Sequence, residues 1–302
     1  MLDTRSCLLA LKQSALLCLL LLAVPSPRAL ASQTTAKIPS VEINRRVIAS
    51  LPTWHGESAH IVDRLDLTRP FGTRTQWTFV VAALPGSRHN AFSRTVDGGS
   101  LAACFVNKLT PHCKYTLPRK PPFLSWVSIP VHFYAAKVAF ARPNHAYPLL
   151  LVKTGSPSGG DGNHAIYTQV FMYDSQENQF KSVFSNDTGS NRNQETVLLE
   201  HGPLRGDIVV AEPTSSAPYA YWISVYPWNR ENPYSHRALR YRSATLYGDG
   251  NPLAVIDSEM PNILEHFGKW RPGDPLPIPR YLPPGCTDHF FLRGHEEWCR
   301  QK

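Results

Sequence analysis

The sequence predicts an all-β protein, either an antiparallel β-sandwich or a propeller-like sheet assembly, with one short helix near residues 258–267. Three observations support this fold class. The 302 residues include 27 prolines and 18 glycines, short runs of β-branched and aromatic residues lie between these breakers, and amphipathic helical stretches are scarce. Runs at this spacing are typical of a sandwich or a propeller.

Residues 1–31 are expected to be a cleaved secretory signal peptide. Arg5 and Lys12 precede the apolar run 15–24, and Ala29 and Ala31 are the small residues that precede the cleavage site. The apolar run is about half as long as the roughly 20 residues that a membrane-spanning helix needs. We therefore expect an exported protein, periplasmic or extracellular, with no membrane insertion after signal cleavage.

Residues 32–302 are predicted to form a single β-rich domain. The alternative is a division into two parts near residue 147. Residues 32–50 are expected to be an N-terminal extension. Strands are predicted over the apolar and β-branched runs 76–84, 126–140, 148–153, 166–173, 180–184, 195–199, 207–212, 219–226 and 238–247.

The predicted helix over 258–267 has a start signal and a stop signal. Ser258 is suited to the N-cap, Glu259 lies in the first turn, and Gly268 follows the last turn. Ile263 and Leu264 lie on its apolar face. The next segment, 271–284, is rich in proline and is expected to run over the surface as an extended strap.

Four cysteines follow the leader, and an even number in an exported chain favours disulfides. Three pairings are available, of which Cys104–Cys113 and Cys286–Cys299 close the shortest loops. We expect this local pairing, which closes a C-terminal tail over 286–299. Because the chain contains no C-x-x-C pair, cysteines are not expected to bind zinc, and no metal or cofactor is predicted.

The tetrapeptide GDGN occurs at 160–163 and again at 248–251. Asp-Gly favours a tight turn because glycine accepts a positive φ. A calcium loop is the alternative, but neither copy continues with the alternating acids and the distal glutamate that such a loop needs. Both copies are therefore predicted to be turns.

Two long phrases, GSNRNQETVLLEHGPLRGDIVVAEPT and ALRYRSATLYGDGNPLAVIDSEMPNI, resemble a family of uncharacterised exported bacterial proteins. The resemblance covers about residues 149–299. It implies a bacterial exported protein, and it brings no activity, ligand or catalytic residue. The segment 149–184 is also similar to one blade of a propeller repeat.

Common catalytic motifs are missing, since the mature sequence contains no G-x-S-x-G and no H-E-x-x-H. Paired carboxylates, as used in glycoside hydrolysis, are the remaining route to catalysis. Asp257 and Glu259 also suit the N-terminus of the predicted helix, where negative charge is favourable. The candidate carboxylates in the second half of the chain are Glu195, Glu200, Asp207, Glu212, Asp257 and Glu259.

A candidate ligand-binding surface lies on the strand near residues 219–229. Alternation places Trp222, Tyr226 and Trp228 on one face, which is a candidate aromatic platform. Arg240 and Arg242 share a face of the next strand and are candidates for contact with an anionic group. The alternatives are packed aromatic rings and solvent-exposed arginines.

We therefore predict a non-enzymatic exported protein that binds a glycan or a protein of the bacterial cell envelope. The alternative is a glycan-directed hydrolase that uses paired carboxylates. The net charge of +8 at pH 7 is spread along the chain. Because no basic stripe alternates with aromatic residues, nucleic acid is not an expected partner.

Overall fold

The computed structural model describes residues 38–53, 55–86, 99–108, 110–114, 131–142, 146–156, 164–191 and 193–302, and the backbone of the two-residue strands β3 (Arg88–His89) and β4 (Val96–Asp97). The expected signal peptide 1–31 and the first GDGN copy lie outside these residues. Residues 37–302 form one compact unit. Every sheet among these residues is antiparallel, so the described chain is all-β and sandwich-like.

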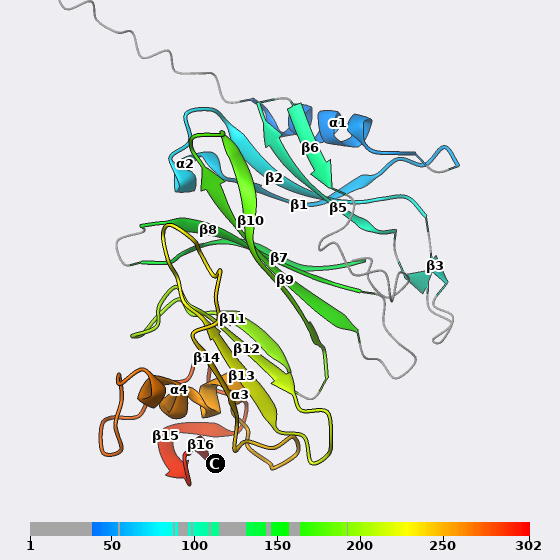
Figure 1. Ribbon diagram of the computed structural model, residues 1–302. Coiled ribbons are helices and arrows are strands. Elements are labelled where there is room, and N and C mark those ends of the chain that lie inside the picture. Colours follow the sequence, from blue (N-terminus) through cyan, green and yellow to red (C-terminus); the bar gives the residue numbers. More distant parts are fainter. Residues whose placement is uncertain are drawn as a thin grey trace, which may run out of the picture. The chain divides into compact units, whose positions relative to one another are not determined.

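The first four-stranded sheet has a helix on one face and a second sheet on the other (Figure 1). Its strands, in spatial order, are β1 (His60–Asp66), β2 (Trp77–Ala83), β5 (Leu101–Asn107) and β6 (Thr110–Lys114). Ile43 and Val47 of helix α1 (Ser40–Ser50) pack against Val80 and Ala102. The strand β2 is buried along its whole length because both of its faces are covered. The short helix α2 (Thr68–Phe71) connects β1 to β2.

The second sheet consists of β10 (Gln179–Gly189), β9 (Ala165–Asp174), β8 (Pro148–Gly155) and β7 (His132–Phe140). Alternate residues of β8 enter two different cores. Leu150 and Val152 pack with the first sheet, whereas Leu149 and Leu151 pack with the third. This double burial explains the unbroken apolar run of β8. The strands β7 and β8, on either side of residue 147, pair as a hairpin.

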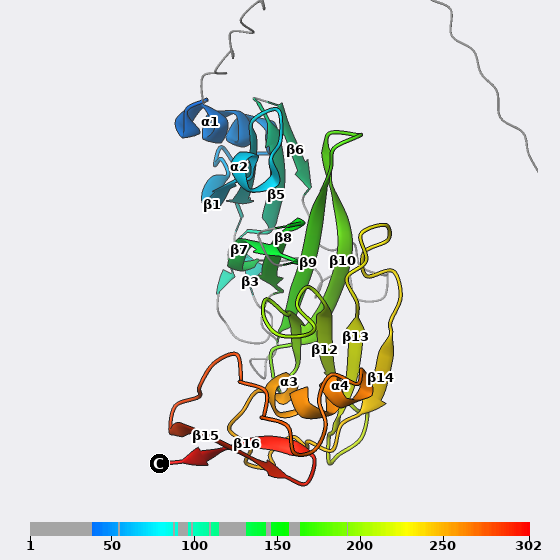
Figure 2. The ribbon, with the colours of Figure 1, turned by 90° about the vertical axis from the view of Figure 1, so that its left-hand side faces the viewer.

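The third sheet consists of β11 (Glu195–Leu198), β12 (Ile208–Pro213), β13 (Tyr221–Tyr226) and β14 (Leu239–Arg242). Ile208 and Val210 face the second sheet, and Val209 and Ile223 face the opposite core. That core is closed by two short helices, α3 (Val255–Ser258) and α4 (Met260–His266), which cover this side of the sheet in Figure 2.

The chain ends in a hairpin of β15 (Cys286–Arg293) and β16 (Glu296–Gln301). The disulfide Cys286–Cys299 joins its two strands, and Cys104–Cys113 joins β5 to β6. Both predicted pairings are confirmed. No helix among the described residues is long and apolar enough to span a bilayer.

The helical prediction needs two corrections. Residues 40–50, which were expected to be an extension, form α1 because Ile43 and Val47 lie one turn apart and enter a core. The predicted helix 258–267 is divided between two short helices, α3 and α4, and Ser258 is the last residue of α3 and caps neither of them. Instead, Glu195 of β11 accepts a hydrogen bond from the backbone N–H of Ile256 at 3.0 Å.

The strand predictions hold for most runs, but β1, β3, β4, β5, β6, β15 and β16 were not predicted. The predicted strand 238–247 ends at Arg242, and residues 126–130 lie outside the described chain. The second GDGN copy, 248–251, is a turn as predicted, with Asp249 accepting hydrogen bonds from the N–H groups of Leu246 and Asn251.

Candidate functional site

An open groove lies on the third sheet, at the end where β12 turns into β13. Its volume is about 600 Å³, which is in the range of small-ligand sites. The groove combines two predicted ligand residues, Trp222 and Arg240, with Glu212 of the candidate carboxylates. The other lining residues are His164, Ala165, Asp187, Thr188, Gly189, Gln194, Pro213 and Ser215.

Trp222 and Arg240 meet because their strands are neighbours in the sheet. Trp222 of β13 pairs with Arg242 of β14, and Arg240 pairs with Ser224, so Arg240 is diagonal to Trp222 on the same face. The guanidinium carbon of Arg240 lies 4.5 Å from the centre of the indole. This cation–π contact holds the N–H donors of Arg240 at the groove.

The opposite wall comes from the end of β10 and the segment that follows it. The side-chain oxygen of Gln194 accepts a hydrogen bond of 2.8 Å from the backbone N–H of Gly189. A Cβ atom at Gly189 would lie 2.6 Å from Nε2 of Gln194, so glycine allows this close approach. Asp187, two residues earlier on β10, contributes a carboxylate to the same wall.

His164 is fixed at the edge of this wall. Its backbone N–H donates to Oγ of Ser190 at 3.0 Å, and its carbonyl accepts from the N–H of Ser190 at 2.9 Å. Its imidazole stacks on Tyr134, with ring centres 5.9 Å apart, and its Nε2 is hydrogen-bonded to the Tyr134 hydroxyl. The groove therefore holds an imidazole, a guanidinium and two carboxylates.

Most of the other candidate carboxylates are used by the fold. Arg280 binds Glu195 and Asp257, with contacts of 2.9 and 2.7 Å. Burial alone would lower the pKa of Arg280, but these two carboxylates raise it above its ordinary value. Glu200 is paired with Lys137.

Glu259 and Asp207 also have structural partners. Glu259 is fully buried and accepts hydrogen bonds from Tyr241 and Thr245. Asp207 accepts a hydrogen bond of 2.8 Å from the backbone N–H of Trp228, and burial raises its pKa. Asp257 lies in the first turn of α3 and Glu259 at the N-cap position of α4, as expected for acidic residues, but Glu259 makes no side-chain capping hydrogen bond and both carboxylates bind side chains of the fold.

The aromatic platform proposed from strand alternation is not continuous. Trp228 is 6% exposed, and Tyr226 packs on Phe184 with ring centres 5.3 Å apart. Trp228 lies beyond Pro227, where β13 has ended, so strand alternation no longer sets its direction. Arg242 is exposed but does not line the groove. Of the five predicted ligand residues, only Trp222 and Arg240 share this groove.

Sequence reasoning missed Asp187, His164 and Gln194. They belong to segments that reach Trp222 only through the packing of the second sheet on the third, and no local motif marks that packing. Comparisons with protein-family models, with curated proteins and with solved structures found no match to this chain.

Proposed function

We propose that this protein is an exported, non-enzymatic binding protein of the bacterial cell envelope, and that its groove holds a glycan. The observation that carries the proposal is the Trp222–Arg240 pair in an open, polar groove. A sugar hydroxyl accepts hydrogen bonds from a guanidinium and donates to carboxylates such as Asp187 and Glu212. Because the groove carries both signs of charge, a neutral glycan suits it better than a polyanion.

Export is part of the same proposal. The leader-like sequence of residues 1–31 supports it, and so do the two disulfides, since disulfides persist in oxidising compartments. A glycan of the envelope is a partner that an exported protein meets. The alternative partner is a protein of the envelope, which would bind this chain in the absence of any glycan.

The test compares Arg240→Gln with Arg242→Gln. Both arginines are exposed on β14 and lie two residues apart, so both variants lose one charge from one strand, but only Arg240 lines the groove. An array of neutral envelope glycan fragments identifies a ligand, and calorimetry measures its affinity. We expect Arg240→Gln to weaken binding about tenfold, which is the loss of one charge-assisted hydrogen bond, and Arg242→Gln to bind as the parent does.

Trp222→Ala is expected to weaken binding of the same glycan, and Trp222→Phe to retain part of it, with thermal unfolding as the check on folding. The proposal is wrong if no fragment binds the parent protein. It is also wrong if both arginine variants weaken binding equally, because the effect would then be one of overall charge.

A glycan hydrolase is the second candidate, and one observation favours it. Asp187 and Glu212 come from different sheets and line the same groove, as the acid and the base or nucleophile of a glycosidase do. Release of new reducing ends by the parent protein, lost in both Asp187→Asn and Glu212→Gln while the glycan still binds, would establish hydrolysis. Binding without product release leaves the protein a binder.

A further inference from the structure

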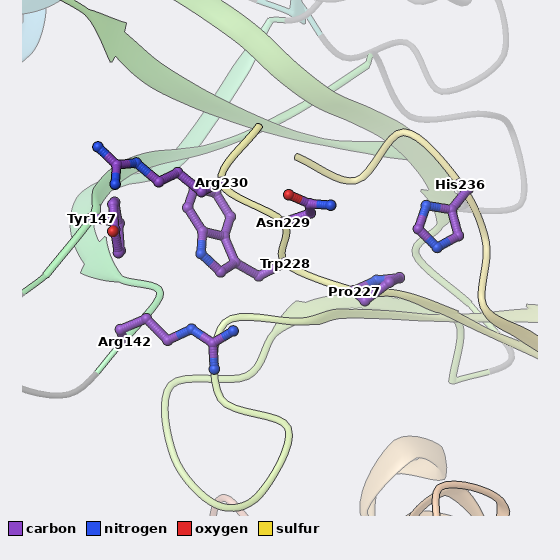
Figure 3. A pocket seen from close by; sticks show the side chains of 7 residues that line it. All are labelled: Arg142, Tyr147, Pro227, Trp228, Asn229, Arg230 and His236. Carbon is purple, nitrogen blue, oxygen red and sulfur yellow. The ribbon is translucent and has the colours of Figure 1, made fainter. Parts of the chain in front are cut away.

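A second pocket, of about 430 Å³, lies where the turn after β7 meets the connection from β13 to β14. Figure 3 shows Arg230 and Tyr147 on one side of the Trp228 ring and His236 at the opposite end of the pocket. Its lining includes Arg142, Tyr147, Trp228, Asn229, Arg230 and His236.

The charged side chains that line this pocket are basic. Arg142 and Arg230 are both exposed, and no carboxylate among the described residues lies within salt-bridge distance of either guanidinium. Asp207 is the acidic group behind the pocket. Its carboxylate accepts a hydrogen bond from the backbone N–H of Trp228 and interacts electrostatically with Arg142, so one carboxylate faces two guanidinium groups. The pocket therefore attracts anions.

The base of the pocket is a rigid aromatic cluster. The ring of Trp228 lies 5.7 Å from the ring of Tyr147 and 5.7 Å from that of Tyr234. The hydroxyl of Tyr234 donates a hydrogen bond of 2.8 Å to the carbonyl of Gly206. Because Trp228 is almost fully buried, only a small part of its indole faces the pocket.

Two of these aromatic residues have strained backbones. Tyr147 has φ of 54° and Tyr234 has φ of 56°, in the left-handed region that bulky side chains avoid. Such conformations are unfavourable for bulky side chains and recur at ligand sites. The strained position of Tyr147 places its ring beneath the guanidinium of Arg230, at 5.4 Å. The contact fixes one basic group at the rim.

We infer that this pocket binds a sugar that carries an oxyanion, either a carboxylate or a phosphate. The planar N–H fork of an arginine matches both groups, and two guanidinium groups flank the aromatic base. The edges of Tyr147 and Trp228 provide an apolar contact for the sugar ring, and the amide of Asn229 is available to its hydroxyls. The groove and the pocket lie at opposite ends of β13. Trp222 lines the groove and Trp228 lines the pocket, and their separation of six residues corresponds to about 20 Å of extended chain.

The experiment measures binding of glucuronate and glucose 6-phosphate by calorimetry, with glucose and inorganic phosphate as reference ligands. We expect at least one of the two acidic sugars to bind more tightly than both references. The variant carrying Arg142→Gln and Arg230→Gln is expected to lose about tenfold or more in affinity. Arg237→Gln is the matched control, because Arg237 is an exposed arginine of the same connection that does not line the pocket.

Arg240→Gln separates this proposal from that of the groove, since it is expected to leave acidic-sugar binding unchanged. The inference fails if neither acidic sugar binds the parent protein, or if Arg237→Gln weakens binding as much as the double variant. Equal affinity for inorganic phosphate and glucose 6-phosphate would also overturn it, because the sugar ring would then contribute nothing.

Discussion

Glu259 and Glu297 are both fully buried, but their surroundings differ. Glu259 accepts hydrogen bonds from the side chains of Tyr241, Thr245 and Asn262. Neither carboxyl oxygen of Glu297 has a hydrogen-bond partner among the described residues. Burial, with a smaller contribution from Asp257, raises the pKa of Glu297 to about 8. The folded protein therefore keeps this side chain protonated at neutral pH.

We predict that Glu297→Gln raises the free energy of unfolding, relative to the parent protein, by more at pH 8 than at pH 4. In the unfolded chain the carboxyl ionises near 4.5, whereas in the folded protein it ionises near 8. Below pH 4.5 the carboxyl is protonated in both states and folding keeps its full stability. As the pH rises from 4.5 to 8, the unfolded chain releases this proton while the folded protein holds it, so the free energy of unfolding falls. Glutamine does not titrate, so the advantage of the variant is expected to grow over this window by about 4 kcal/mol.

Chemical denaturation at several pH values measures this difference, with Glu265→Gln as the control because Glu265 is exposed. An advantage of the same size at pH 4 and pH 8 would show that Glu297 does not titrate as proposed.

Among the elements, the proline-rich strap 271–284 depends on side-chain anchors. It forms no helix or strand, in agreement with the sequence prediction. Arg280 ties it to β11 through Glu195 and to α3 through Asp257. Near its start, the indole N–H of Trp270 donates a hydrogen bond of 3.1 Å to the carbonyl of Pro275. One arginine thus connects the strap, the third sheet and the helices.

Arg280→Met is predicted to destabilise the protein by about 3–5 kcal/mol, because the buried carboxylate of Asp257 would lose its charged partner and keep only the 3.3 Å hydrogen bond from the backbone N–H of residue 280. The strap would also lose its main anchor, so proteolysis under native conditions is expected to cut within 271–284 much faster than in the parent. Thermal unfolding and mass mapping of the fragments measure the two effects. Arg271→Gln is the control in the same segment, since Arg271 is exposed, and equal behaviour of the two variants would contradict the prediction.

The sequence predicted elements well where a local signal exists. The runs that form β2, β8, β9 and β12 carry such signals, and so do the cysteine pairs that join neighbouring strands. The start of α3 was missed because its backbone N–H is satisfied by Glu195, a residue about 60 positions earlier in the chain. A distant cap of this kind leaves no local pattern.

For the whole molecule, the expected leader predicts where the exported chain begins, and the two disulfides predict how its cysteines are paired. Expression in a bacterial host with the natural leader should yield a chain that begins at Ser32, because the small residues before this position suit signal cleavage. Intact mass of the protein recovered outside the cytoplasm measures the cleavage site, and non-reducing peptide mapping is expected to find Cys104 with Cys113 and Cys286 with Cys299. Recovery of the uncleaved chain in the membrane fraction would refute export by this leader.

The candidate site was only partly predictable because it depends on how the sheets pack. Alternation grouped Trp222 with Tyr226 on one strand and Arg240 with Arg242 on the next, but it did not indicate that Trp222 and Arg240 lie on the same face of the sheet. The opposite wall, with Asp187 and Gln194, comes from β10 and the segment after it. Side chains of the second and third sheets pack together in one core. The periodicity of a single strand shows which of its faces is apolar, but not which sheet packs against that face.

Strand β14 is short and forms an edge of its sheet in the described chain. Its exposed arginines, Arg240 and Arg242, place two positive charges along a row of backbone groups that would otherwise be a template for a strand of another molecule. Charges on an edge strand oppose this kind of pairing, because two identical edges repel each other. Arg242, which does not line the groove, adds a charge that opposes edge-to-edge pairing of two copies of this chain.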